Sequence, residues 1–152
     1  MRRKEKEITD PAEIEQLITQ ARVCRIGLVD GNKPYVVPVC FGYEKKAFYF
    51  HCAPEGYKLE LIKKNNSVCV EIDTDIDIIC AEKPCGWSTK YRSVIGVGRA
   101  YILEDGKDKI DGLTVIMRQF GEKRPEMEFE RAERAVVVRI DIEHITGKKS
   151  GY

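Results

Sequence analysis

Two basic side chains, His51 and Lys58, lie close together in the sequence where an aromatic strand-like run gives way to a helix-like segment. His51 belongs to the run Ala47–Cys52, and Lys58 falls in the first turn of the segment that follows. The first backbone amides of a helix lack partners within it and carry partial positive charge, so a lysine and a histidine beside a helix start can bind a phosphate. An amphipathic helix that keeps Lys58, Lys63 and Lys64 in water explains the same pattern without any ligand.

The cysteines and histidines do not follow the spacing of a metal site. Cysteines at positions 24, 40, 52 and 69 lie in apolar strand-like runs, and the N-terminus has no signal-peptide pattern, which favours reduced thiols in the core over disulfides. Cys80 and Cys85 lie in an irregular segment at a spacing that suits zinc poorly, and only two histidines are present to complete a site. We therefore expect no metal.

A hairpin must position His51. Pro34–Tyr43 is almost wholly apolar, and residues 44–46 form the turn into the strand that ends near His51. Because Pro34–Tyr43 lacks the alternation of a half-exposed strand, it is predicted to be covered on both faces. A helix or a subunit is the ordinary cover, and a flat ligand is the alternative. Pro38 lacks a backbone N–H, which predicts an edge strand or irregular backbone.

The other segments supply the strands and helices around this hairpin. Helices are predicted at residues 11–20, where Asp10 is the cap, at 56–65 and at 105–121, with a short helical connector at 125–134. Strands are predicted at residues 22–30, 68–73, 91–103 and 135–142, and the turn Asp30-Gly31 joins the first of them to Pro34. Gly96 and Gly98 share one face of their strand, which predicts a close approach there. Residues 74–90 are assigned only as a strand end and a long loop, residues 1–9 as a flexible tail and residues 144–152 as a polar tail.

Length and composition predict one globular domain over residues 1–152. Hydrophobic residues make up 43% and charged residues 34%, and 26 basic against 25 acidic residues leave a net charge of +1. So small a charge gives no field that would attract nucleic acid or an acidic membrane. No apolar stretch has the length of a membrane span, so we expect a cytoplasmic protein that binds neither nucleic acid nor a membrane.

About six strands joined by hairpins or single helices indicate a mainly β protein, and a small antiparallel barrel is the favoured architecture. A β-sandwich or an open α+β sheet explains the pattern nearly as well, because periodicity does not reveal strand order.

Three separated stretches resemble one known family. They are PYVVPVCFGYEKKAFYFHCAPEGYKLELIKKNNSVCVEID, WSTKYRSVIGVGRA and VVVRIDIEHITGKKSG, in this order. Over roughly residues 12–150 the chain is similar to the FMN-binding split-barrel proteins related to pyridoxamine 5'-phosphate oxidase, and within them to the nitroimidazole-resistance (Nim-type) branch. The resemblance implies a six-stranded Greek-key split β-barrel with peripheral α-helices, a homodimer, and FMN in grooves at the subunit interface. The doubly apolar strand and the paired glycines agree with such a dimer.

The resemblance also implies the flavin contacts. It places the strand of residues 35–39 along the isoalloxazine ring, the strand end at residues 49–51 beside the flavin, and Lys58 on the phosphate. Ser93, next to Arg92, falls where the oxidases have a flavin-contacting glutamine. The implied contacts are Val37, Pro38, Val39, Tyr49, Phe50, His51, Lys58, Arg92 and Ser93. His51 would donate a proton to a reduced acceptor, or else contact the phosphate or ribityl chain without a chemical role.

Departures from the oxidases narrow the function. Tyr35, Cys40 and Ile95 stand where the oxidases have basic residues, and the motif that holds the pyridoxal phosphate product is missing. We therefore expect an FMN-dependent oxidoreductase that reduces small acceptors, nitroaromatic or quinone-like, with NAD(P)H as a candidate donor. The alternative is a flavin-binding or storage protein without turnover. Haem binding ranks last, because only His51 and His144 are available as ligands.

Overall fold

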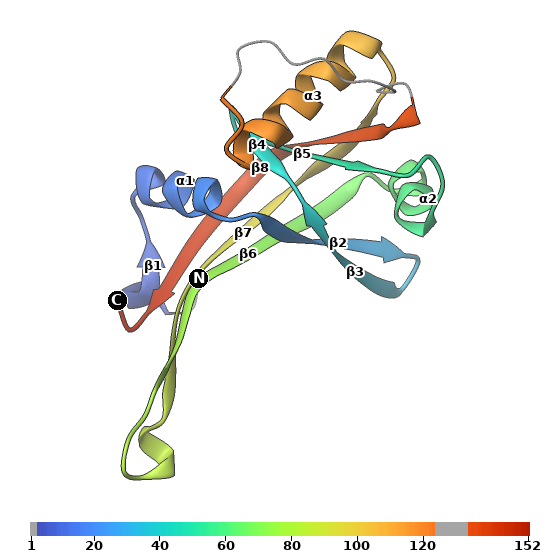
Figure 1. The fold of residues 1–152 in the computed structure, drawn as a ribbon. Coiled ribbons are helices and arrows are strands. Elements are labelled where there is room, and N and C mark those ends of the chain that lie inside the picture. Colours follow the sequence, from blue (N-terminus) through green and yellow to red (C-terminus); the bar gives the residue numbers. More distant parts are fainter. Residues whose placement is uncertain (1–2, 124–133) are drawn as a thin grey trace.

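The computed structural model of the protein describes residues 3–123 and 134–152, and its strands form one antiparallel sheet that curves into an open barrel (Figure 1). Along the main path the strands follow the order β3-β2-β6-β7-β8-β5-β4, and β1 pairs with β8. Their bounds are β1 Glu7–Ile8, β2 Val23–Asp30, β3 Lys33–Cys40, β4 Gly42–Glu44, β5 Ala47–Cys52, β6 Ser67–Ile79, β7 Ser88–Leu103 and β8 Val136–Ser150. β3 and β4 are consecutive pieces of one segment that pair at opposite ends of this order, so the barrel is split between them. The predicted mainly β split barrel with peripheral helices is confirmed.

Three α-helices lie outside the sheet in the described ranges: α1 Pro11–Gln20, α2 Tyr57–Lys64 and α3 Gly106–Gln119. α1 begins as predicted, because the Asp10 carboxylate accepts a hydrogen bond from the Ala12 amide at 2.9 Å. The end of α1 is satisfied from α3, where the buried Gln119 amide donates to the carbonyls of Ile18, Thr19 and Ala21 at 2.9–3.0 Å. None of these helices is long and apolar enough to cross a membrane.

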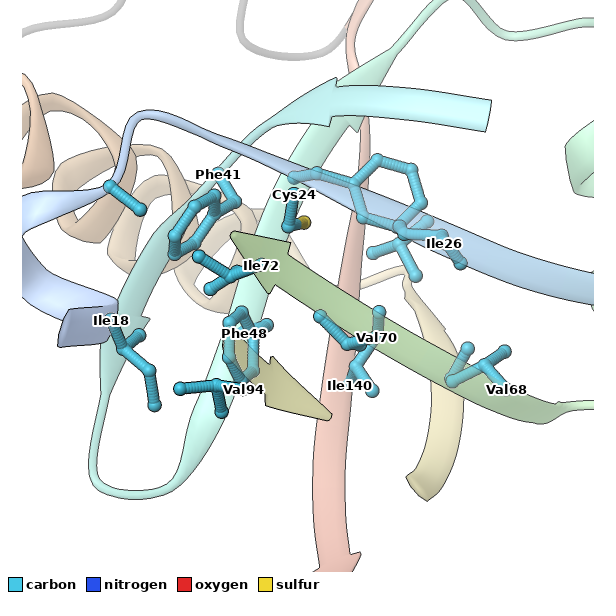
Figure 2. Packing of buried hydrophobic residues seen from close by; sticks show 14 of the residues in the cluster. Ile18, Cys24, Ile26, Phe41, Phe48, Val68, Val70, Ile72, Val94 and Ile140 are labelled. Carbon is cyan, nitrogen blue, oxygen red and sulfur yellow. The ribbon is translucent and has the colours of Figure 1, made fainter. Parts of the chain in front are cut away.

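The core fills the barrel with the inward residues of the strands. Phe41, Phe48 and Phe50 are its largest fully buried side chains. Figure 2 shows how side chains from α1, β2, β6, β7 and β8 gather around Phe41 and Phe48. Alternation along β2 and β6 is as predicted, with Cys24 and Ile72 among the inward residues. Of the six cysteines only Cys24 is fully buried, so the expectation that most of them lie in the core is wrong.

Three segments are more regular than the sequence predicted. β6 and β7 run on through most of residues 74–90 and end in a short 3-10 turn, Pro84–Gly86, that points away from the barrel (Figure 1). β8 continues to Ser150, so most of the expected polar tail is strand. Within the expected flexible tail, β1 pairs with β8 and buries Ile8. The connector predicted at 125–134 lies outside the described residues except for Arg134.

The two glycines of β7 have a different cause from the one expected. A Cβ on Gly98 would collide with the Asp141 carbonyl, and one on Gly96 would lie 3.1 Å from Ile142 Cδ1. Both neighbours belong to β8, which carries an extra residue here, since Val97 pairs with His144 and Gly98 with Ile142. The close approach is therefore made by β8 of the same chain, and the glycines are no argument for a dimer.

Candidate functional site

The outer face of β3 is uncovered. Tyr35, Val37 and Val39 are half-buried against the core, whereas Val36, Pro38 and Cys40 are exposed, Val36 to 63%. β3 ends the strand order and pairs with β2 alone among the described strands, which agrees with the edge predicted from Pro38. The predicted cover on the second face does not come from the described part of this chain, so a ligand or a second subunit has room there.

The start of α2 lies against the β2–β3 hairpin. The Tyr57 ring meets Tyr35 edge-on at 5.1 Å between centroids, and its hydroxyl donates to Asp30 Oδ2 at 2.7 Å. This hydrogen bond raises the pKa of Tyr57. Gly56 is the N-cap, with φ of 144°, and supplies no side chain to the free amides of the first turn. Lys58 is half-buried in that turn, so a cation and unpaired amides occur together as predicted.

Of the three predicted contacts on β5, only His51 is fully exposed. The Phe50 side chain is 1% exposed in the core, and Tyr49 packs beneath α3, where burial raises its pKa. His51 is exposed, and within residues 3–123 and 134–152 its side chain has no hydrogen-bond partner. Burial raises the pKa of the neighbouring Cys52, and the Lys58 charge opposes that rise. Lys58 is thus close enough to act on the end of β5 beside His51.

Arg92 and Ser93 lie at the opposite end of the sheet. His51 pairs with Val137 on β8, and Val137 pairs with Leu103 on β7, ten residues beyond Ser93. At about 3.3 Å per residue this places Ser93 ~33 Å from the His51 level, farther than one FMN molecule reaches. One chain therefore does not bring all the predicted contacts together, and the roles of Arg92 and Ser93 stay predictions.

The Arg92 side chain is already engaged within the chain. Its Nη1 lies 2.7 Å from Asp75 Oδ2, and its guanidinium lies 3.8 Å from the centre of the Tyr152 ring. Glu13 is a further, more distant ionic neighbour at 3.9 Å. These contacts tie the base of the β6–β7 extension to the C-terminus and α1.

The sequence reasoning missed a shallow apolar groove on the outer face of the sheet. It has a volume of about 280 Å³ and runs beside Gly27, with Val36 and Cys69 directly opposite Gly27 on β3 and β6, and Val97 opposite Cys69 on β7. Gly27 leaves the floor without a side chain. A glycine at an outward strand position is the sequence signal that would have found this groove.

Two larger cavities are of different character. One, of about 570 Å³, lies between α3 and β5 and is lined by the charged residues Arg118, Arg139, Asp108 and Asp111 among others. The other, of about 490 Å³, is bordered by His144 on β8. His144 lies seven residues along β8 from the partner of His51, a separation of about 23 Å, so the two histidines cannot share one haem iron within a chain. Residues 3–123 and 134–152 contain no cluster of three metal-binding side chains.

Comparison with known proteins decides the family. A family model described as pyridoxamine 5'-phosphate oxidase matches residues 10–149. The chain belongs to this family. As a member of the pyridoxamine 5'-phosphate oxidase family it is a relative of flavin-binding proteins, which confirms the resemblance drawn from the three sequence stretches. No curated protein matches the sequence.

Solved structures resemble this family member over most of its length. A candidate 5-nitroimidazole antibiotic resistance protein from Bacteroides thetaiotaomicron is 31% identical, with a TM-score of 0.82 over 94% of this chain and 86% of that one. The FAD and heme binding protein from Mycobacterium smegmatis has 17% identity and a TM-score of 0.86 over 97% and 74% of the chains. A FAD-binding protein from Mesorhizobium loti has 23% identity and a TM-score of 0.69 over 93% and 96%. At these last two identities the likeness shows the fold alone.

Proposed function

We propose that this protein binds FMN against the outer face of β3, with its phosphate at the start of α2. The observation that carries the proposal is the uncovered apolar face of β3, where Val36 is 63% exposed, on the edge strand whose Tyr35 also contacts Tyr57 at the helix start that bears Lys58. A flat aromatic ring system suits an apolar strand face, and a phosphate dianion suits an ammonium group and unpaired amides. Membership of a flavin-binding family supports the choice of ligand.

The choice of FMN over FAD follows from the phosphate end of the site. α2 offers one helix start and one half-buried lysine in its first turn, Lys58, whereas Lys63 and Lys64 are exposed in the last turn. That arrangement suits a single terminal phosphate. The related structures described as FAD-binding are under 25% identical, so they do not argue for FAD in this chain.

We further propose that the flavin lies between two copies of the chain. The support is the ~33 Å along β7 between the level of His51 and Ser93, because at that separation the two predicted contacts of one chain do not reach the same flavin. The uncovered outer face of β3 gives a second copy a surface to approach.

The proposed activity is the reduction of small electron acceptors, nitroaromatic or quinone-like, with NAD(P)H as the donor. Bound flavin supplies the hydride and electron chemistry, and the protein orients the ring and limits access to it. His51, exposed at the end of β5, would donate the proton that a reduced nitro or quinone oxygen takes up, because histidine is the side chain used most often as a general acid. The 31% identical relative, described as a candidate nitroimidazole resistance protein, supports nitro compounds as acceptors.

One observation favours a flavin-binding protein without turnover. A catalytic histidine is usually oriented by a hydrogen bond that its second ring nitrogen donates to a carbonyl or carboxylate, and His51 has no such partner in the described chain. In that case His51 would contact the phosphate or the ribityl chain and take no part in proton transfer.

Anaerobic reduction distinguishes the two functions. The FMN-loaded protein is reduced with NADH or NADPH until the visible flavin band is bleached, and a nitroaromatic or a quinone is then added. If the protein is a reductase, the visible flavin band returns rapidly when the acceptor is added. His51→Gln should then bind FMN normally but regain the band about a hundred-fold more slowly, the usual effect of losing a general acid. Equal recovery in both proteins would remove His51 from the chemistry. No recovery in the wild type would leave the storage function.

A further inference from the structure

The sheet has a gap between β5 and β1. β8 pairs with β7 on one side, and on its other side it pairs with β5 as far as Asp141 and with β1 from Gly147 on (Figure 1). The last bond toward β5 is made by the Ile142 amide, which donates to the Lys46 carbonyl at 3.2 Å. Residues 143–146 have no strand partner on that side within the described chain. At about 3.3 Å per residue the gap is ~13 Å long, the length of a small organic molecule.

A β-bulge lies in the same stretch. Val97 pairs with His144 and Gly98 with Ile142, so Glu143 is the extra residue of β8. Strand residues direct their backbone hydrogen-bonding groups alternately to the two sides, so those of residues 143–146 that point away from β7 face the gap. Because backbone N–H and C=O groups are normally paired in folded proteins, these groups are available to water or to a ligand.

The gap opens into the cavity of about 490 Å³ beside β8, since residues 143–146 all line it. Its walls are largely apolar. Ile8 on β1 and Ile14 on α1 are buried, and Ile142 and Ile145 on β8 are half-buried. A cavity of this size, with apolar walls and a few polar groups, has the character of a small-molecule site.

Tyr43 on β4 supplies one of those polar groups. Its ring packs against the buried Phe48 at 4.9 Å between centroids, which fixes its position. The Tyr43 hydroxyl has no hydrogen-bond partner in residues 3–123 and 134–152. Burial raises the pKa of Tyr43, and the negative charge of Glu15, which also lines the cavity, raises it further. The hydroxyl is therefore neutral, lies near a carboxylate, and has oxygen lone pairs free to accept a hydrogen bond.

The charged side chains around the cavity are mainly acidic. Glu7 and Glu15 have no ion-pair partner among the described residues, whereas Glu143 pairs with an arginine of β7 at 3.1 Å. The basic side chains of the lining are Lys46 and His144. Two unpaired carboxylates against one lysine and one histidine give the cavity a field that favours a cation over an anion.

We propose that this cavity binds an amphipathic amine, a small molecule with an apolar body and a protonated amino group. The isoleucine walls hold the body, and the ammonium donates hydrogen bonds to the Glu15 carboxylate and the Tyr43 hydroxyl. The free backbone carbonyls of residues 143–146 are further acceptors. This site is separate from the proposed flavin site, because Lys46 precedes β5 and His51 lies near the far end of that strand.

Isothermal titration calorimetry of the full-length protein tests the choice of a cation. Naphthylethylamine and naphthylpropanoate share an apolar body and carry opposite charges near neutral pH. We expect the amine to bind at least roughly ten-fold more tightly than the propanoate, with the same affinity in the presence and absence of FMN. Failure of the amine to bind, or equal affinity of the two probes, would overturn the proposal. Displacement of the amine by FMN would place it at the flavin site and overturn the proposal as well, whereas failure of FMN to bind would leave it intact.

Two cavity variants and a matched control test the ammonium contacts. Glu15 is exposed on α1 and Glu82 is exposed in the turn between β6 and β7, so changing either to glutamine removes one charge without disturbing the core. Glu15→Gln should weaken the amine roughly ten-fold without weakening the propanoate, and Tyr43→Phe should weaken the amine several-fold. Glu82→Gln should change neither affinity. Amine affinity that is unchanged in the cavity variants, or lowered equally by Glu82→Gln, would overturn the proposal.

NMR of isoleucine methyl groups locates the bound amine. The cavity walls carry four isoleucines, Ile8, Ile14, Ile142 and Ile145. Ile110 borders the charged cavity beside α3, and Ile78 lies in the part of β6 beyond the barrel, so both serve as remote references. Naphthylethylamine should shift the methyl signals of the four wall residues and leave those of Ile78 and Ile110 unchanged. Shifts at the reference residues without shifts at the walls would overturn the proposal.

Discussion

Replacement of Lys58 by alanine is the sharpest test of the phosphate end of the site. Lys58 lies in the first turn of α2, where the amides are unpaired and the helix field favours an anion. The residue as a whole is half-buried beside the end of β5. The change removes one charged hydrogen bond donor and leaves the helix start itself in place.

The magnitude follows from that geometry. A hydrogen bond to a charged group contributes about 1.5–3 kcal/mol, so Lys58→Ala should weaken FMN binding roughly ten- to a hundred-fold. Lys63 is the matched control, an exposed lysine in the last turn of the same helix, where the field disfavours an anion. Lys63→Ala should change binding by less than about 0.5 kcal/mol. Lys64 is a poorer control because it also lies 3.9 Å from Asp30.

Quenching of flavin fluorescence on titration measures both variants, with riboflavin as a ligand that lacks the phosphate. Riboflavin should bind the wild type, Lys58→Ala and Lys63→Ala with similar affinity. Equal losses of FMN affinity at the two lysines would reduce the effect to general charge. An equal loss of riboflavin and FMN in Lys58→Ala would show damage to the ring site and refute the phosphate contact.

Three further predictions concern the scaffold. Gly98→Ala should lower the free energy of unfolding by about 3 kcal/mol or more in denaturant, since the new methyl meets the backbone of β8. Gly96→Ala should cost about 1 kcal/mol, because its methyl meets only the end of the Ile142 side chain. Similar losses in the two variants would contradict the close packing of β7 against β8. Gln119→Leu should cost about 1–3 kcal/mol by the same measurement, because it removes the buried amide that donates to the carbonyls of Ile18, Thr19 and Ala21, and an unchanged midpoint would refute this cap. Burial raises the pKa of Cys24 from 9.0 to about 12, so above about pH 9 the unfolded chain loses a proton that the folded chain keeps, and stability falls with rising pH. The fall should be smaller in Cys24→Ala, and an equal fall would assign it to other groups.

Much of the fold could be predicted because its elements are encoded locally. The Asp10 cap, the Asp30-Gly31 turn and the alternation of β2 and β6 depend on neighbours in sequence, and the structure has them as expected. Pairing between distant strands carries no such local signal. β8 beyond Ile142 is polar and was therefore expected to be a tail, yet it pairs with β7. Gly96 and Gly98 predict a close approach to β7, but only the pairing register between β7 and β8 shows that β8 is the neighbour.

The candidate site was predictable to the same extent. His51 and Lys58 are near in sequence, so their position near the same strand end required no long-range information. Phe50 was assigned to the flavin by resemblance, yet its side chain lies in the core. The extension of β6 and β7 beyond the barrel was not predicted, because one extra residue at Asp75 reverses which face of the strand each later residue of β6 occupies. An alternating run of aspartate and isoleucine does not show where the bulge falls.

The central claim, that this protein binds FMN, is tested most directly by the chromophore itself. Purified protein should be yellow, and denaturation should release FMN, identified by chromatography against FMN, FAD and riboflavin. Colourless protein should bind added FMN to about one molecule per chain, with the fluorescence of the free flavin quenched. Release of FAD would contradict the choice of cofactor. A colourless preparation that also fails to bind added FMN would contradict the account as a whole.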